Sequence, residues 1–378
     1  MTDLLIQQAS RHALYTQRFA GHLSNLFDPY IDRLQREIKL ILIDGPEETR
    51  DVRRINRLIA EWRTVSVAVY GEYNDDILLA ELEEFTTQES EWQGKSIESV
   101  VESKSVNIVS PSPVQVWAGV NTAPLIFPDS NGVKVLLPFV KGWEDNQIKK
   151  VGDIIRTGFI TGRTSQQIAQ DIAGKNGYLD NQNRKSIKTM VRTATNHISN
   201  IARQETNAQN KDIVIGYEIV ATLDGRTSNY CTGADGTEVF NKGLIVWGST
   251  GRKEKTKYKP QPPFHPNCRT TTSPILDARY RIDNSDATRA SSGASGGKQV
   301  DASLTRYEWL KQQGQQGEKG REFVRDALGI ERADLLIDGG LTAKEFSRLT
   351  LDEVFRPIPL KELRKKQSLQ LAFDRVDG

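Results

Sequence analysis

Two cysteines and a histidine lie close enough in the sequence to share one chemical centre. Cys231 and Cys268 are the two cysteines of the chain, and His265 stands three positions before the second one. Thiolates and imidazoles are ligands that Zn²⁺ prefers, and a tight turn would let His265 and Cys268 face the same ion. Asp224 or Asp235 could supply the fourth ligand of a tetrahedral site. The sequence therefore contains a candidate zinc site that would join the two ends of a long insertion.

Two other interpretations use these residues without a metal. Cys231 has no second cysteine within four residues, as a zinc knuckle usually would. Both cysteines could instead be small buried side chains, while Asp224, Arg226 and His265 form hydrogen bonds and an ion pair that hold the loops. A disulfide between Cys231 and Cys268 could form after release from a reducing cytosol. We favour the hydrogen-bonded loops and keep zinc and the disulfide as alternatives.

An enzyme could use the same side chains for acid–base chemistry. His265 would act as the general base and Asp224 would orient its imidazole. Arg226 or Arg269 would hold an anion, which suits phosphodiester or acyl chemistry. No glycine-rich phosphate loop, carboxylate pair or second histidine lies nearby in the sequence. We therefore expect a binding protein, with a nuclease- or toxin-like enzyme as the alternative.

Helices and short strands must position these side chains. Apolar residues recur at helical spacing over about 181–210, and their period then changes to two over 214–223, which predicts a long helix followed by a strand. Asp224 and Gly225 make a turn, after which Thr227 or Ser228 can cap a helical turn that carries Cys231. Residues 238–240 and 244–247 predict two more strands. We expect a small sheet packed on the long helix.

The remaining chain predicts a mostly helical α+β protein. Residues 1–104 show amphipathic helical patterns, and His12, His22 and His197 are expected to be ordinary surface or core histidines. Prolines exclude a continuous helix after residue 105, where we expect extended segments, one of them at 114–117, and a hairpin turn at 129–132. The predicted organisation is an N-terminal helical region (1–104), a Pro-rich irregular or extended crossing (105–144), the module with helices and a small sheet (145–282), a Ser/Gly-rich flexible linker (283–302), and a helical C-terminal docking segment with a basic tail (303–378).

Composition limits the classes of protein. The chain of 378 residues has a formal net charge of only +2, so any contact with nucleic acid must come from a local patch. No apolar run approaches the roughly 18 residues of a membrane span, and the N-terminus lacks the pattern of a secretory signal. We expect a protein made in the cytosol, without a disulfide framework. One local basic loop could touch DNA phosphates or an acidic partner surface: Arg252, Lys253, Lys255, Lys257 and Lys259.

The order of motifs around the cysteines resembles a known family. A long helix with Arg-Gln-Glu-Thr-Asn at 203–207 precedes a strand, a first motif at 224–231 and a second motif at 263–269. This order is similar to that of the phage Mu F-like (MuF) head morphogenesis, or minor head protein, family over about residues 145–275. The positions that carry the resemblance are Asp224, Gly225, Arg226, Thr227, Cys231, His265, Pro266, Asn267, Cys268 and Arg269.

The resemblance implies a component of a phage head. Such a minor protein binds the portal vertex and assists head assembly, DNA packaging or DNA ejection, so its expected partners are the portal protein, the capsid or scaffold, and packaged double-stranded DNA, with no membrane. Its expected location is the virion, after assembly in the host cytoplasm. A DNA-binding internal virion protein is a further alternative. Residues 307–354 resemble the C-terminal segment of some phage members. Members often carry another cysteine directly after the arginine, where this chain has Thr270.

Overall fold

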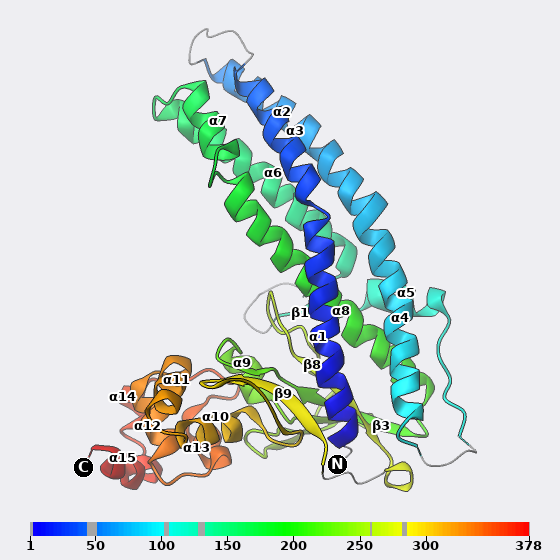
Figure 1. The fold of residues 1–378 in the computed structure, drawn as a ribbon, viewed down its shortest axis with the longest axis vertical. Helices are drawn as coiled ribbons and strands as arrows, with labels where there is room; N and C mark the ends of the chain where they lie inside the picture. Colours follow the sequence, from blue (N-terminus) through cyan, green and yellow to red (C-terminus); the bar gives the residue numbers. More distant parts are fainter. Residues whose placement is uncertain are drawn as a thin grey trace.

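A shaft of long helices stands on a compact body in the computed structural model, which describes residues 3–43, 51–101, 106–127, 133–257, 259–281 and 286–377. Figure 1 shows the shaft rising from the body, where the strands and the C-terminal helices gather. Helix accounts for 62% of the chain and strand for 12%, which confirms a mostly helical α+β protein. The helices of the shaft are α1 (Asp3–Asn25), α2 (Asp28–Ile43), α3 (Val52–Tyr73), α4 (Leu79–Glu98), α6 (Leu136–Ile160), α7 (Ser165–Ala173) and α8 (Arg184–Gln209).

One apolar core runs through the whole shaft. Helices α2 and α3 pack on α7 and α6, while α1 and α4 pack on α8. Buried side chains from residues 20–201 therefore form a single cluster, and the regions predicted as 1–104 and 145–210 share it. The amphipathic pattern is confirmed, for example by Ile31, Leu34 and Ile38, which are fully buried. Despite their length, no helix among the described residues is apolar enough to cross a membrane.

The segment predicted as an irregular crossing is partly helical. Residues 113–122 form helix α5 (Pro113–Thr122), so the prediction of an extended segment at 114–117 is wrong. Ser112 and Gln115 form a capping box, and Pro113 takes the first helical position, where its missing N–H is not needed. A short ladder does join β1 (Leu125–Ile126) to β2 (Val133–Lys134), but the turn predicted at 129–132 lies outside the described residues.

The sheet that follows α8 has five antiparallel strands in the order β7-β6-β5-β3-β8. It confirms the strands predicted at 214–223, 238–240 and 244–247. The last strand, β8, follows directly after the motif at 263–269. It pairs with β3, which lies between β5 and β8, so the sheet joins the two ends of the long insertion. The strands are β3 (Val214–Val220), β5 (Glu238–Phe240), β6 (Leu244–Val246), β7 (Lys253–Lys255) and β8 (Thr271–Leu276).

The predicted flexible linker at 283–302 is wrong for the residues that the structure describes there. Strands β9 (Thr288–Gly293) and β10 (Gly296–Asp301) form a hairpin, and β9 also pairs in parallel with β4 (Leu223–Asp224). Small Ser and Gly side chains bury little apolar area, but backbone pairing needs none, and Gly296 supplies the positive φ of 86° that the turn requires. Arg289 anchors the hairpin through an ion pair with Asp235 at 3.0 Å.

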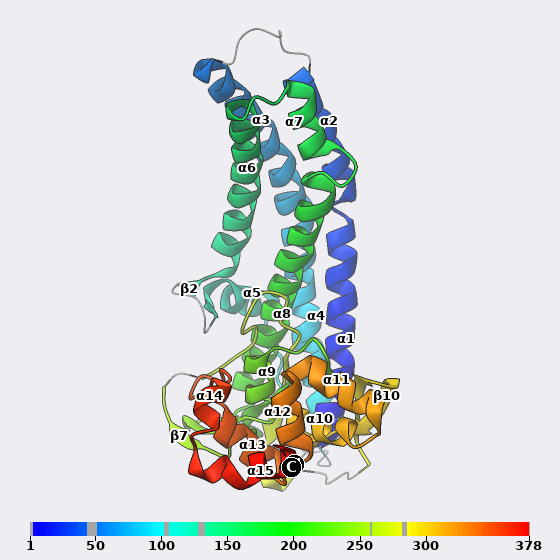
Figure 2. The same cartoon turned by 90° about the vertical axis from the view of Figure 1, so that its left-hand side faces the viewer.

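The C-terminal helices dock onto the sheet module. Figure 2 shows them gathered at the base of the molecule. They share one apolar cluster with the sheet, in which Phe355 lies between Tyr230 and Trp247. Residues 303–377 are therefore part of the body and not a separate unit. The helices are α10 (Arg306–Gly314), α11 (Glu318–Leu328), α12 (Ile330–Ile337), α13 (Ala343–Thr350), α14 (Leu360–Leu363) and α15 (Gln370–Asp377).

A buried carboxylate joins the shaft helices at the end nearest the body. Glu89 on α4 pairs with Arg203 on α8 at 3.1 Å, and both side chains are 1% exposed. His12 on α1 also contacts Glu89, and its ring stacks on Trp92. Burial acts to raise the pKa of Glu89, but Arg203 and His12 outweigh it and hold that pKa below its usual value. The carboxylate is thus charged in the fold and links three helices.

Replacing Glu89 with alanine should leave the buried Arg203 guanidinium without its carboxylate partner, although its hydrogen bond to the Thr271 hydroxyl remains. We expect a loss of about 3–5 kcal/mol in the free energy of unfolding, measured by urea denaturation followed by circular dichroism. Glu91→Ala is the matched control, because its pair with Lys95 is long, at 3.8 Å, and exposed. Its cost should stay below about 1 kcal/mol. Equal losses in the two variants would contradict the role of this pair.

The stability that the Glu89 carboxylate contributes should depend on pH, because its pKa is lowered on folding. The contribution to the free energy of unfolding should be fully present above the unfolded-state pKa of about 4.3 and should be lost as the pH falls through the lower folded-state pKa.

Candidate functional site

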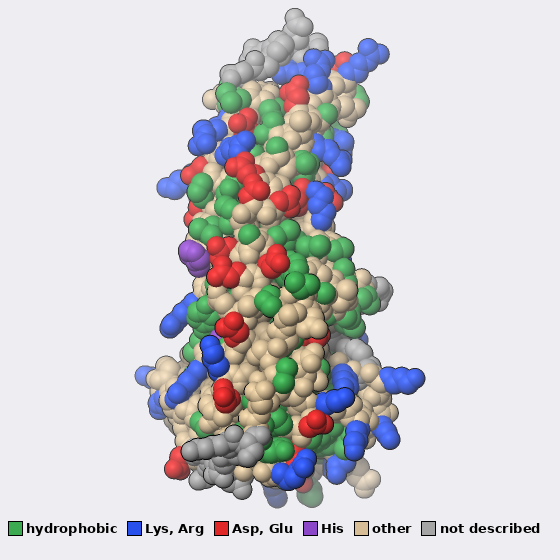
Figure 3. Space-filling model, turned by 90° about the vertical axis from the view of Figure 1, so that its right-hand side faces the viewer, with side chains coloured by type: hydrophobic (Ala, Val, Ile, Leu, Met, Phe, Trp, Pro, Cys, Tyr) green, Lys and Arg blue, Asp and Glu red, His purple; other side chains and the backbone are tan. Residues whose placement is uncertain are grey.

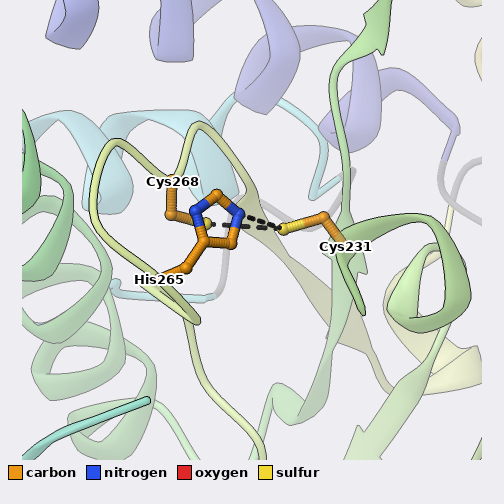
Figure 4. Close-up of side chains that lie close together, drawn as sticks. All are labelled: Cys231, His265 and Cys268. Atoms are coloured by element: carbon orange, nitrogen blue, oxygen red, sulfur yellow. Dashed lines mark hydrogen bonds between the residues drawn. The ribbon is translucent and has the colours of Figure 1, made fainter. Parts of the chain in front are cut away.

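The structure brings Cys231, His265 and Cys268 together. Their ligand atoms lie within 4.8 Å of one another. Cys231 sits in the short helix α9 (Asn229–Ala234), which the Ser228 side chain caps, as the sequence predicted. His265 and Cys268 come from the loop before β8, and Asn267 takes the positive φ of 62° that lets this loop turn tightly. Figure 4 shows the imidazole and both sulfur atoms facing one another.

Contacts to helix α8 hold the turn at Asn267. Its backbone N–H donates to the Thr193 hydroxyl at 3.1 Å, and its side-chain amide donates to the Thr189 hydroxyl at 2.9 Å. Sequence reasoning missed both threonines. Their spacing of four residues places them on one face of the helix, which is a signal common to many helices and points to no particular partner.

Hydrogen bonds fix which nitrogen of His265 faces the cysteines. Its Nδ1 lies 2.8 Å from the Pro266 carbonyl oxygen, which can only accept, so Nδ1 carries a proton. Nε2 therefore points to the cysteine side, 3.2 Å from the Cys231 sulfur and 2.9 Å from the Ser228 hydroxyl. A backbone carbonyl that orients one ring nitrogen while the other faces the centre is the usual arrangement of a metal-binding histidine.

The distances suit a tetrahedral zinc ion. Zinc bonds of about 2.3 Å to sulfur and 2.0–2.1 Å to nitrogen imply edges of about 3.8 Å between two sulfurs and about 3.6 Å between sulfur and nitrogen. The two sulfur atoms lie 3.6 Å apart, and Cys231 Sγ lies 3.2 Å from His265 Nε2. These two edges differ from the ideal ones by a few tenths of an ångström, and the third edge, between Cys268 and His265, is no longer than 4.8 Å. These residues therefore fit zinc.

Neither aspartate proposed as the fourth ligand is available for that role. Asp224 accepts two hydrogen bonds from Arg269, and Asp235 accepts from Arg289 and from backbone N–H groups. The prediction of Asp224 or Asp235 as a ligand is therefore wrong. A cavity of about 20 Å³ lies beside Cys231, His265 and Ser228, and it has room for one water molecule. Three protein ligands and a water would give an open zinc site.

The pKa values of the two thiols, Cys231 and Cys268, are shifted in opposite directions. Both side chains are 2% exposed, and both are free thiols. Burial raises the pKa of Cys268, but Cys231 and His265 outweigh it and hold that pKa well below its usual range. Cys268 and then burial raise the pKa of Cys231 well above its usual range, while Cys268 raises the pKa of His265. The cluster thus favours one thiolate, the form that binds metals.

The geometry separates Asp224 from the histidine. Besides Arg269, the Asp224 carboxylate accepts hydrogen bonds from the Arg226 backbone N–H at 2.9 Å and from the Thr227 hydroxyl at 3.1 Å. Burial acts to raise the pKa of Asp224, but Arg269 outweighs it and lowers that pKa. The proposed orientation of His265 by Asp224 is therefore wrong, because a backbone carbonyl does this instead. The ion pair that we expected in these loops joins Asp224 to Arg269. We call this pair the clamp, because it links the first motif to the second.

Comparison with known families identifies the region around this site. Residues 149–273, about a third of the chain, match the model of a family described as "Phage Mu protein F like protein". The chain carries a phage Mu F-like module. It spans α6 to β8 and includes the Cys231, His265 and Cys268 cluster together with the Asp224–Arg269 pair. The family points to a phage head morphogenesis protein and to the virion as its location. Neither the curated proteins nor the solved structures gave a match.

In the Mu F-like module, Thr270 lies beside the cluster. Thr270 is 1% exposed, and its side chain hydrogen-bonds Cys231. A cysteine at this position would face the same centre as Cys231, His265 and Cys268. With threonine here, the cluster has three strong ligands, and a fourth must come from a hydroxyl or from water.

Elemental analysis of the purified protein should find about one zinc per chain, and Cys268→Ser should lose it. Metal binding to a buried site adds to folding free energy, so a chelator should lower the melting temperature of the native protein and not that of Cys268→Ser. His22→Ala, which changes an exposed histidine on α1, is the matched control and should keep its zinc. Two free thiols and no metal in the native protein would instead support the hydrogen-bonded loops.

Proposed function

We propose that this chain is a minor head protein that attaches to the phage portal vertex and assists head assembly, DNA packaging or DNA ejection. The observation that carries the proposal is the phage Mu F-like match over residues 149–273. The shape of the chain agrees with such a role. A long shaft and a compact body, fixed to each other by α1 and α8, give two separate surfaces for partners.

We also propose that the role is binding and not catalysis. Both cysteines are buried, with 2% of each residue exposed. Asp224 is bound to Arg269 and does not support His265 as a base. A protein that only holds two loops together requires the same Pro, Asn and paired side chains.

A portal-binding test needs the portal protein encoded by the same phage. We expect the full chain to co-migrate with assembled portal rings in size-exclusion chromatography, with a dissociation constant of about 1 μM or tighter. The portal protein of an unrelated phage is the control and should not retain the chain. Absence of binding, together with normally infectious heads assembled without the chain, would contradict the proposal.

A second role, contact with DNA, is favoured by the edge of the sheet. Strand β7 is the outermost strand, and Lys253 and Lys255 on it are exposed. Lys257 follows two residues after the strand and is also exposed, so three ammonium groups lie in a short stretch at this edge. The other two predicted cations have local partners. Arg252 pairs with Glu254 at 3.5 Å, and Lys259 donates to the Asn241 carbonyl.

The face of the shaft drawn in Figure 3 gives no comparable signal. Lys and Arg are interspersed with Asp and Glu along it. Mixed charges of this kind produce no strong field of one sign, so they give DNA no reason to bind along that face. We assign the DNA contact to the β7 edge of the body.

Neutralising this edge should weaken binding to duplex DNA. The triple variant Lys253→Gln, Lys255→Gln, Lys257→Gln should lower affinity for all sequences alike and reduce the salt slope of log K by about three, since each lysine would release about one counterion. Fluorescence anisotropy over a series of salt concentrations measures both effects.

The matched control for this edge removes the same charge from the shaft, in Lys175→Gln, Lys185→Gln, Lys188→Gln, whose lysines are also exposed. Equal salt slopes in both triple variants would show that the contact is not specific to the edge.

A further inference from the structure

A cleft opens between the shaft and the second motif. It has a volume of about 380 Å³ and is walled by α1, by α8 and by the loop that contains residues 265–269. This volume is near the lower end of the range of about 300–1,000 Å³ that is typical of small-molecule sites. The cleft is formed by segments nearly 260 residues apart, because Thr16 and Gln17 face Asn267 and Thr271 across it. Such a hollow exists only in the folded protein.

The side chains around the cleft are strongly cationic. Arg192 from α8, together with Arg226 and Arg269 from the two motifs, lines the cleft, and no Asp or Glu is among its described lining residues. The nearest carboxylate, Asp224, pairs with Arg269 and lies 3.7 Å from the Arg226 guanidinium. Three guanidinium groups therefore share one carboxylate, and two positive charges are in excess at the cleft. The side chains of Arg192 and Arg226 are exposed.

Neutral donors complete the wall. Asn196 and Gln17 contribute side-chain amides, and Thr16 contributes a hydroxyl. The Asn196 amide already donates to the Thr270 carbonyl at 2.9 Å, which fixes its position at the base of the cleft. Guanidinium groups bind planar or tetrahedral oxyanions through paired N–H donors.

We propose that this cleft binds the phosphate group of a small phosphate monoester. A monoester dianion carries two negative charges, which match the excess of two positive charges that Arg192, Arg226 and Arg269 leave after Asp224 is counted, whereas a carboxylate carries only one. Duplex DNA offers one charge per phosphate on a convex surface that is too wide to enter the cleft. The proposal depends neither on attachment to the portal nor on metal in the adjacent cluster.

Isothermal titration with phenyl phosphate tests the proposal on the full chain. We expect saturable binding of one molecule per chain, weakened about tenfold or more in Arg192→Gln and in Arg226→Gln, because each loses charged hydrogen bonds. Arg348→Gln is the matched control, since it removes the same charge from an exposed position on α13 outside the cleft. Its affinity should equal that of the native chain. Unchanged melting temperatures of the three variants establish that the fold is retained.

Two further probes distinguish the sources of the anion. Benzoate should bind at least tenfold more weakly than phenyl phosphate, and a 12-base-pair duplex should not displace phenyl phosphate. Equal binding of benzoate would overturn the phosphate assignment. Displacement by the duplex would assign the cleft to the DNA backbone instead of a small ester. No saturable binding of phenyl phosphate, or equal affinities of Arg192→Gln and the native chain, would overturn the site itself.

Discussion

The carboxylate of Asp235 holds three parts of the body in one arrangement. It is 1% exposed and accepts hydrogen bonds from the Ala221 backbone N–H at the end of β3, from the Arg289 guanidinium on β9 and from the Arg306 backbone N–H at the start of α10. Burying a carboxylate is costly unless charged and polar partners surround it, so these segments must be in place together. Arg306 also donates to the Asp224 carbonyl, which connects this centre to the clamp between the two motifs. The geometry of the cysteine cluster therefore depends on an ionic centre that contains none of its residues.

Much of the helical and sheet structure could be predicted from sequence, because it follows from local periodicity. Apolar residues alternate from Tyr217 to Leu223, and the shaft helices place Leu34 and Ile38 on one face. The proximity of Cys231, His265 and Cys268 also follows from a tight turn and a short capped helix. By contrast, α5 was missed because prolines were interpreted as breaking the helix, although Pro113 favours the first helical position.

Long-range contacts account for the other errors. The hairpin of β9 and β10 has the composition of a linker, and it is ordered by Arg289 and by pairing with β4, neither of which leaves a local signal. The same limit applies to the fourth ligand. By their spacing, Asp224 and Asp235 are reasonable candidates for the fourth zinc ligand. In the fold, however, Asp224 pairs with Arg269, 45 residues away, and Asp235 pairs with Arg289, 54 residues away. Charged residues reveal their partners only when the fold brings them together.

The position of α1 has a consequence for synthesis on the ribosome. This first helix packs against α8, β8 and β9, and the Gln7 side chain accepts a hydrogen bond from the Thr288 backbone N–H, 281 residues later. At roughly 5–20 residues per second, the helix waits on the order of tens of seconds before its last partner leaves the ribosome. Its apolar face must meanwhile be shielded by provisional contacts or by a chaperone. The shaft and the body can therefore lock together only after β9 has left the ribosome.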